Sequence, residues 1–128
     1  ESGVRYWTVL GLLMRGGDTV RANADALRER LKDESPSVRT AAAEALGRYG
    51  NDADARVALD VLTDLASLAN NDMYTALAAL NAIDQMENRA KPALAKLRTL
   101  PTKQDGLEQR LTNYVPRLMA DLIAKLEA

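Results

Sequence analysis

Cysteine and histidine are both absent from this sequence of 128 residues. Without them the chain can form no disulfide, no thiolate nucleophile, no zinc site of cysteine or histidine ligands and no imidazole acid or base. A reaction would have to rely on carboxylates with lysine or tyrosine alone. We therefore expect a chain that is not an enzyme and holds no cofactor or metal. The lack of cysteine identifies no compartment, because reducing and oxidising environments both tolerate it.

Aromatic residues are scarce as well, at 4% of the chain, and phenylalanine is missing. Hydrophobic residues still reach 47%, so the core must be aliphatic, chiefly leucine and alanine. Alanine is the best helix former, whereas strands favour β-branched and aromatic residues. The composition therefore predicts an all-α fold, and the length suits one domain with a single core.

An excess of one charge is also lacking, since 17 basic residues face 18 acidic ones and the net charge is −1. This balance disfavours a nucleic-acid partner, which is attracted by a strongly basic surface. No run of about 20 apolar residues predicts a membrane span, and no signal segment opens the chain. The chain starts at Glu1 rather than methionine and enters a helical pattern at once, so we expect a piece of a longer protein.

The sequence does contain a repeat, and a repeat at a fixed interval decides the architecture. Val4-Arg5 recurs as Val38-Arg39, a shift of 34 (38 − 4). The same shift carries Leu12 to Leu46, Gly16 to Gly50, Asp18 to Asp52 and, into a more degenerate third unit, Leu46 to Leu80. Each unit contains a first helix, A, and a second helix, B. We place the units at about 3–33, 36–69 and 72–100, followed by a capping helix at 105–127.

Local signals give the boundaries. Helix A of unit one runs from about 3 to 14, where Gly16 ends it, and Asp18 or Thr19 is expected to cap a helix B that ends near residue 32. Unit two opens with Ser35 as N-cap and Pro36 at the first helical position. Proline lacks an N–H, but an N–H at this position would have no acceptor within the helix. Helix A of unit two ends near residue 48.

The B helices and the cap are predicted from apolar residues at steps of three or four. Pro116 removes one backbone hydrogen bond, so we expect a kink or break near Tyr114-Val115. The predicted buried positions are Ala55, Leu59, Leu62 and Leu65 in unit two, Ala90, Leu94, Leu97 and Leu100 in unit three, and Leu107, Leu111, Tyr114, Leu118, Leu122 and Leu126 in the cap.

The stretch 33–47 reads DESPSVRTAAAEALG, in which an Asp and a Pro precede Val-Arg and an alanine-rich helix ends in Ala-Leu-Gly. It resembles the HEAT-repeat signature. The resemblance implies a right-handed α–α superhelix, HEAT- or armadillo-like, of about three helix pairs and a C-terminal cap. The interval of 34 and Trp7-x-x-Leu10-Gly11 also fit tetratricopeptide repeats, but Ala41 and Glu44 stand where that family has Trp and Leu.

Three further blocks resemble the helical extension that follows the catalytic domain of some bacterial sulfatases: SGVRYW at 2–7, AEALGRYG at 43–50 and ALNAID at 79–84. This resemblance implies an accessory domain that packs on, or shapes access to, an adjacent catalytic domain, and a periplasmic or secreted location. The family's Cys/Ser-x-Pro-x-Arg motif is absent. The alternative function is an independent scaffold that binds another protein.

Arg5 and Arg39 begin the A helices of units one and two, near turn residues Asp18, Asp33 and Asp52. We expect these arginines to bond turn carboxylates and carbonyls between repeats, as repeated structural residues together with Gly16, Gly50 and Pro36. Binding of an external anion is the alternative.

Candidate interface residues are Tyr6, Trp7, Arg21, Arg28 and Asp64. Tyr6 and Trp7 point about 100° apart on a helix, so both can hardly be buried in one seam, and either could dock a neighbouring domain or pack inside. The other three are charged B-helix residues of the scaffold hypothesis. The stretch Asn70-Asn71-Asp72 predicts a turn and N-cap rather than a calcium site.

Overall fold

The computed structural model describes all 128 residues and contains helices but no strand. The predicted all-α class is confirmed. In chain order the elements are α1 (Ser2–Met14), α2 (Gly17–Ala22), α3 (Ala24–Arg30), α4 (Pro36–Tyr49), α5 (Asp52–Leu65), α6 (Met73–Gln85), the 3₁₀ helix η1 (Glu87–Ala93), α7 (Leu94–Leu97), the 3₁₀ helix η2 (Gln109–Leu111) and α8 (Tyr114–Glu127).

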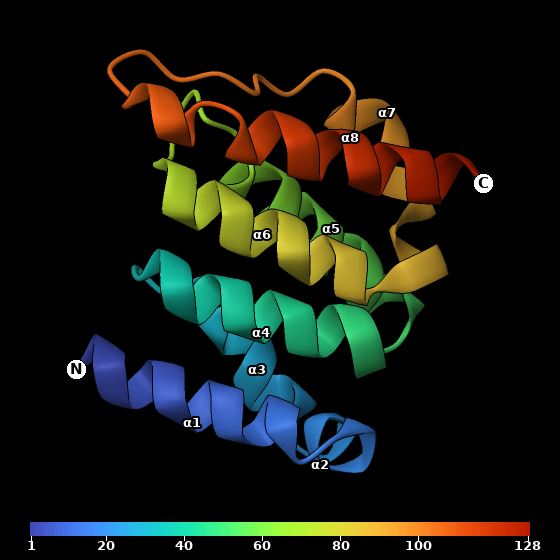
Figure 1. Cartoon of the computed structure of the whole chain (residues 1–128). Helices are drawn as coiled ribbons and strands as arrows, with labels where there is room; N and C mark the ends of the chain where they lie inside the picture. The colour runs from blue at the N-terminus through green and yellow to red at the C-terminus, as the bar shows by residue number, and fades with distance from the viewer.

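The helices form two layers, which Figure 1 shows one behind the other. The A layer is a row in which α1 contacts α4, α4 contacts α6 and α6 contacts α8. The B layer consists of α2 and α3, then α5, then η1 with α7, and α5 packs on both α4 and α6. This staggered succession is a HEAT-like superhelix, because each pair of helices buries its apolar face against the next pair.

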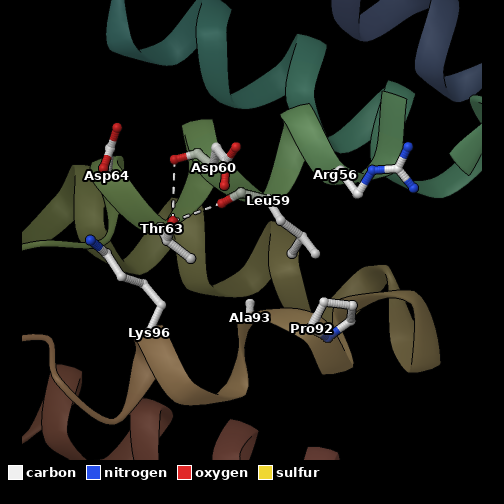
Figure 2. A pocket seen from close by; sticks show the side chains of 8 residues that line it. All are labelled: Arg56, Leu59, Asp60, Thr63, Asp64, Pro92, Ala93 and Lys96. Atoms are coloured by element: carbon white, nitrogen blue, oxygen red, sulfur yellow. Dashed lines mark hydrogen bonds between the residues drawn. The ribbon is translucent and has the colours of Figure 1, made fainter. Parts of the chain in front are cut away.

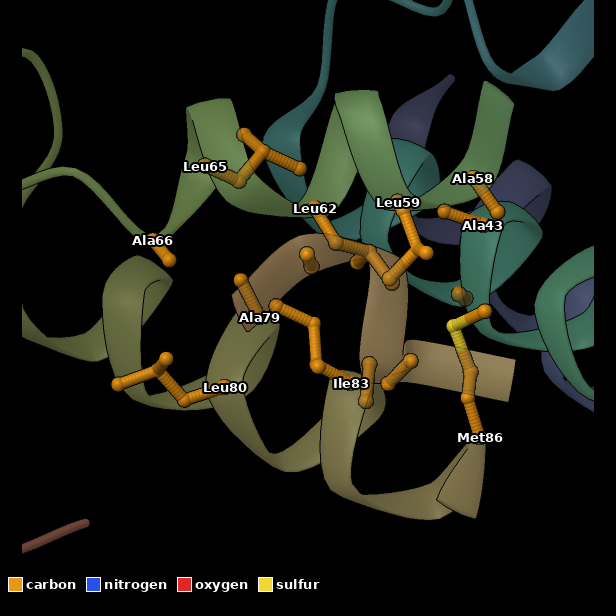
Figure 3. Packing of buried hydrophobic residues seen from close by; sticks show 14 of the residues in the cluster. Ala43, Ala58, Leu59, Leu62, Leu65, Ala66, Ala79, Leu80, Ile83 and Met86 are labelled. Carbon is orange, nitrogen blue, oxygen red and sulfur yellow. The ribbon is translucent and has the colours of Figure 1, made fainter. Parts of the chain in front are cut away.

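One hydrophobic cluster of 32 buried residues runs through both layers. Its centre is α4, where Ala42, Ala43, Ala45 and Leu46 are fully buried. Alanine side chains are small, so neighbouring helices can approach α4 closely from both sides, and leucines of α5 and α6 fill the remaining space (Figure 3). The predicted stripe Ala55, Leu59, Leu62 and Leu65 is buried as expected.

The repeated glycines meet two different needs. Gly16 has a φ of 97°, a left-handed conformation that glycine adopts without the steric penalty of a side chain. Gly50 has an ordinary φ of −76°, but a Cβ atom there would lie 2.6 Å from the carbonyl oxygen of Leu46 and 2.6 Å from the Cβ of Asp54. The first glycine is required by the backbone and the second by close packing.

The start of α4 follows the sequence prediction. Ser35 is the N-cap, where its Oγ accepts a hydrogen bond from the amide of Val38, and Pro36 occupies the first helical position. The predicted ends of α1 and α4 agree with the structure to within one residue.

Helix B of unit one differs from the prediction, because it is divided at Asn23 into α2 and α3. The Asn23 side chain donates to the carbonyl of Thr19, which is typical of an asparagine that competes with backbone hydrogen bonds. The predicted cap at Asp18 or Thr19 is also wrong. Gly16 is the N-cap of α2 without any side-chain bond, and Asp18 instead pairs with Arg21 at 2.7 Å.

The B part of unit three is not a continuous α-helix. It is the 3₁₀ helix η1, which contains Pro92, followed by the single turn α7. Proline lacks the N–H that an α-helix requires in its interior. Ala90 and Leu97 are buried as predicted, whereas Leu94 and Leu100 are only half-buried.

The capping helix starts later than predicted. Residues 101–108 are irregular, and α8 begins only at Tyr114, at the place of the predicted break. Pro116 therefore lies in the first turn, where a missing N–H costs little. The buried residues are Val115, Met119, Leu122 and Leu126; Leu107, Leu111 and Leu118 are half-buried and Tyr114 is exposed. Because α8 packs on α6, it fills the fourth place of the A layer.

A first prediction concerns the helix caps. The Oδ1 of Asp72 accepts a hydrogen bond of 2.7 Å from the amide of Thr75 at the start of α6, so Asp72→Ala is expected to lower the free energy of unfolding by about 1 kcal/mol. Asp18→Ala removes an exposed ion pair but no cap and is expected to cost less than about 0.5 kcal/mol. Urea denaturation of both variants measures the difference, and equal losses would contradict the assignment of the caps.

Candidate functional site

Arg5 ties α1 to the turn before α4. Its Nε donates to Oδ2 of Asp33 at 2.7 Å, and its Nη2 donates to Oδ1 at 3.2 Å. Asp33 is buried and also accepts hydrogen bonds from the Ser35 amide at 2.9 Å and from Arg30 at 3.3 Å. The hydrogen bond from Arg5, followed by that from Ser35, holds the pKa of Asp33 well below its usual range. Arg5 thus makes the predicted bond to a turn carboxylate.

A second pair of this kind joins α3 to α5. Arg28 donates from Nε and Nη2 to the two carboxylate oxygens of Asp54, at 2.8 and 2.9 Å. Asp54 is buried and completes a capping box with Asn51, and the Arg28 hydrogen bond lowers the pKa of Asp54. Arg28 was proposed above as an interface residue. Because it is committed to this bidentate pair, charge reversal there would disturb the fold rather than test a partner.

Arg39 behaves differently from Arg5, although it occupies the same position of the repeat. It makes no ion pair with any turn carboxylate, and its Nε is buried without a hydrogen-bond acceptor. The expectation that Arg39 bonds a turn carboxylate is therefore wrong. Asp18 pairs with Arg21, and Asp52 lies 3.9 Å from Arg89. Arg39 lines an open cleft, which keeps the alternative of anion binding available.

Arg89 is a structural residue that the sequence analysis did not identify. From η1 it donates four hydrogen bonds of 2.8–3.0 Å to the carbonyls of Gly47, Arg48, Gly50 and Asn51, at the end of α4 and the following turn. The carbonyls of Gly47, Arg48 and Gly50 accept no backbone hydrogen bond, whereas that of Asn51 also accepts from the amide of Ala55, so the guanidinium satisfies the three free carbonyls and joins unit three to unit two. Its acceptors are backbone carbonyls, so no pattern of residue types in the sequence predicts this contact.

A surface groove runs between α5 and the B part of unit three. It has a volume of about 430 Å³ and is lined by Arg56, Leu59, Asp60, Thr63 and Asp64 of α5 and by Pro92, Ala93 and Lys96 on the other side. We call it the α5–α7 groove. A second hollow of about 570 Å³, the Arg39 cleft, shares Thr63, Asp64 and Lys96 with it and adds Arg39, Ser67, Asn70 and Asn71. The two hollows are therefore continuous on the B face.

Several charges in the groove are uncommitted. Arg56, Asp60, Asp64 and Lys96 all have exposed side chains and take part in no ion pair of the structure. Figure 2 shows Lys96 rising from α7 toward Thr63, whereas Asp64 points away from α7. The Thr63 hydroxyl bonds the Leu59 and Asp60 carbonyls of its own helix. A surface of both signs with no internal partners can make ion pairs with another molecule.

The remaining candidates lie apart from this groove. Arg21 pairs with Asp18 and also donates to the Tyr49 carbonyl at 3.4 Å. Tyr6 packs against the core, and Trp7 is 68% exposed on α1. The two side chains are thus not both buried, as their separation of about 100° on the helix predicts. A role of either residue in an interface stays a prediction. Of the five candidates, only Asp64 lines the groove.

The polar stretch before α6 has a structural role. Asn71 donates from Nδ2 to the carbonyls of Asp64 and Ser67, and Asp72 caps the helix. No group of three or more acidic residues is arranged to hold a metal ion. None of the helices combines the length and apolar character needed to cross a membrane.

Comparison with known proteins adds one decisive finding. A family model described as HEAT repeats matches residues 2–81, which is more than half of the chain. The chain belongs to the HEAT-repeat family. The match covers the first two HEAT units and most of α6, and the irregular B part of unit three lies outside it. No curated protein and no solved structure matches the chain, so no relative supports the sulfatase resemblance.

A second prediction concerns pH. Asp33 and Asp54 have lowered pKa values in the folded HEAT units, while an unfolded aspartate titrates near about 3.9. The unfolded chain therefore binds more protons in this range, and stability is expected to fall as the pH drops from about 5 through the folded pKa values. The Asp33→Asn/Asp54→Asn variant should show a flatter decline of the urea midpoint. Asp121→Asn, at an exposed position without an ion pair, is the control and should match the parent.

Proposed function

We propose that this HEAT-repeat chain is a scaffold that binds another protein through its B face. The observation that carries the proposal is the set of uncommitted charges along the α5–α7 groove. Nine of the 17 cationic side chains form ion pairs within the chain, and of the eight that do not (17 − 9), Arg56 and Lys96 line the groove and Arg39 lines the adjoining cleft. Complementary charges on a partner would set its orientation and speed its association.

The shape of the groove favours an extended segment over a small metabolite. It is an open surface hollow between two elements, and four of its eight lining residues carry a charge. Small-molecule sites are mostly enclosed and apolar, with a few placed polar groups. Stacked helix pairs instead present long surfaces on which a partner can lie across several repeats.

A third prediction tests this scaffold. Asp64→Lys reverses a groove charge that holds no internal partner, so the fold should persist while capture of the bound protein weakens roughly tenfold. Asp121→Lys makes the same change of net charge on α8, away from the groove, and should leave capture unchanged. Quantitative pull-down with both variants and the parent chain is the measurement. Equal capture by all three would remove the groove from consideration.

A second function, packing against a catalytic domain, rests on a different surface. Val4, Trp7 and Met14 are 63, 68 and 77% exposed and lie at helical spacing along one side of α1. An exposed apolar stripe of this kind suits contact with another domain. A sulfatase-like enzyme is the parent that the sequence resemblance implies.

This second function can be tested from the gene. We expect an upstream catalytic region with a Cys/Ser-x-Pro-x-Arg motif, and a parent sequence without that motif would remove the sulfatase assignment. Trp7 fluorescence supplies a physical check. Its emission should shift to shorter wavelength when the flanking domain is present, because burial in an interface removes the indole from water, and an unchanged spectrum would speak against docking on α1.

A further inference from the structure

A contact that is present in unit one is missing from unit two. The shift of 34 carries Arg5 to Arg39 (39 − 5) and Asp33 to Ser67 (67 − 33). The two turn residues occupy equivalent places in the structure. Asp33 accepts a hydrogen bond from the amide of Ser35, and Ser67 accepts one from the amide of Ala69, in each case two residues further along. Unit two thus keeps the arginine and the turn but lacks the carboxylate between them.

This loss leaves Arg39 without its acceptor. In unit one the Nε of Arg5 donates to Asp33 at 2.7 Å, whereas the Nε of Arg39 is buried and has no partner. A buried donor that carries part of a positive charge is costly until an acceptor reaches it. The Ser67 hydroxyl is too short to take the place of a carboxylate and makes no bond to Arg39.

The space beside Arg39 is open to solvent. It is the cleft of about 570 Å³ described above, and its charged lining residues are Arg39, Lys96 and Asp64. Two cations and one carboxylate give this lining a net charge of +1. Asp64 is exposed, forms no ion pair with either cation, and points away from α7. Asn70 and Asn71 add amide groups at the rim.

We propose that the Arg39 cleft receives an aspartate or glutamate side chain of a partner protein, which takes the place that Asp33 holds in unit one. This deepens the proposed scaffold function and rests on it. The partner carboxylate accepts hydrogen bonds from the guanidinium of Arg39, and Lys96 adds a second positive charge from α7. The partner segment then continues along the α5–α7 groove, which shares Thr63, Asp64 and Lys96 with the cleft, and its basic side chains can pair there with Asp60 and Asp64.

The ion pair of unit one indicates that a carboxylate is the group that fits beside this arginine. Arg5 and Asp33 form a two-bond fork in which Nε and Nη2 meet the two oxygens of a planar group. Arg39 carries the same planar guanidinium, and because its Nε is buried, a carboxylate that enters from the cleft takes its two hydrogen bonds from Nη1 and Nη2. A partner that brings its own carboxylate therefore completes a contact for which the repeat already provides the geometry.

The probe is an acetylated and amidated leucine–aspartate–leucine tripeptide, titrated into the ¹⁵N-labelled 128-residue chain and observed by NMR. We expect a saturable shift of the Arg39 Nε–H signal and of the Ser67 and Lys96 amides. The matched leucine–asparagine–leucine peptide keeps the size but lacks the charge, and it should produce no saturable shift. Equal responses to both peptides, or no response of Arg39, would overturn the proposal.

The variant Ser67→Asp provides the internal test, because it restores the carboxylate of unit one. It is expected to shift the Arg39 Nε–H signal without any peptide, to raise the unfolding temperature by roughly 4 °C, and to abolish the peptide response. Ser67→Asn is the matched control and should retain the response. If Ser67→Asp does not fold, Arg39→Gln supplies the loss of response instead. A full peptide response in either Ser67→Asp or Arg39→Gln would contradict the site.

Inorganic phosphate distinguishes the source of the anion. We expect phosphate to shift the Arg39 signal only at higher concentration than the aspartate peptide, since it gains nothing from the groove. Tighter binding of phosphate would overturn the assignment to a carboxylate side chain. The outcome is also separable from the scaffold proposal. Asp64→Lys tests the groove by capture, whereas the peptide titration tests Arg39 without any partner, so either can fail alone.

Discussion

Close packing around α4 is the constraint on which the other contacts depend. This helix touches α1, α2, α3, α5 and α6, and its alanines are buried almost completely. Larger side chains on α4 would push the A layer and the B layer apart, because a packed interior has no room for added atoms. The turns before and after α4 are therefore held at fixed distances from their neighbours, and arginines of units one and three reach them from defined directions.

Those arginines connect the units through polar contacts at the edges of the apolar core. Arg5 reaches the turn before α4, Arg28 reaches the start of α5, and Arg89 reaches the end of α4. In each case the guanidinium meets oxygens that would otherwise be buried or left at a helix end without a partner. Removal of such an arginine would leave those oxygens unsatisfied, so these residues belong to the fold and are poor candidates for binding another protein.

The sequence predicted the parts of this structure that repeat, and it failed where the repeat fails. The interval of 34 and the Ser35-Pro36 start gave α1, α4 and the buried stripe of α5, because these depend on local capping and periodic leucines. The break at Asn23 and the 3₁₀ helix around Pro92 depend on a single side chain each. The spacing of apolar residues over a whole segment does not reveal the effect of one side chain. The late start of α8 shows the same limit, since leucines at helical spacing continue through residues 107 and 111 without forming one helix. Arg89 was missed because its four acceptors are backbone carbonyls, which leave no mark in the sequence.

The candidate site likewise lies where the repeat is incomplete. A polar group whose partner is present in its own unit is satisfied inside the chain, as Arg5 is by Asp33. When one unit keeps the arginine and loses the carboxylate, the chain gains a positive charge whose geometry is already fixed by the packing of α4. Stability alone would favour restoring the pair or replacing the arginine with an apolar residue of similar volume. The presence of an unpaired Arg39 beside an open cleft and Lys96 therefore favours a partner that supplies the missing oxygens.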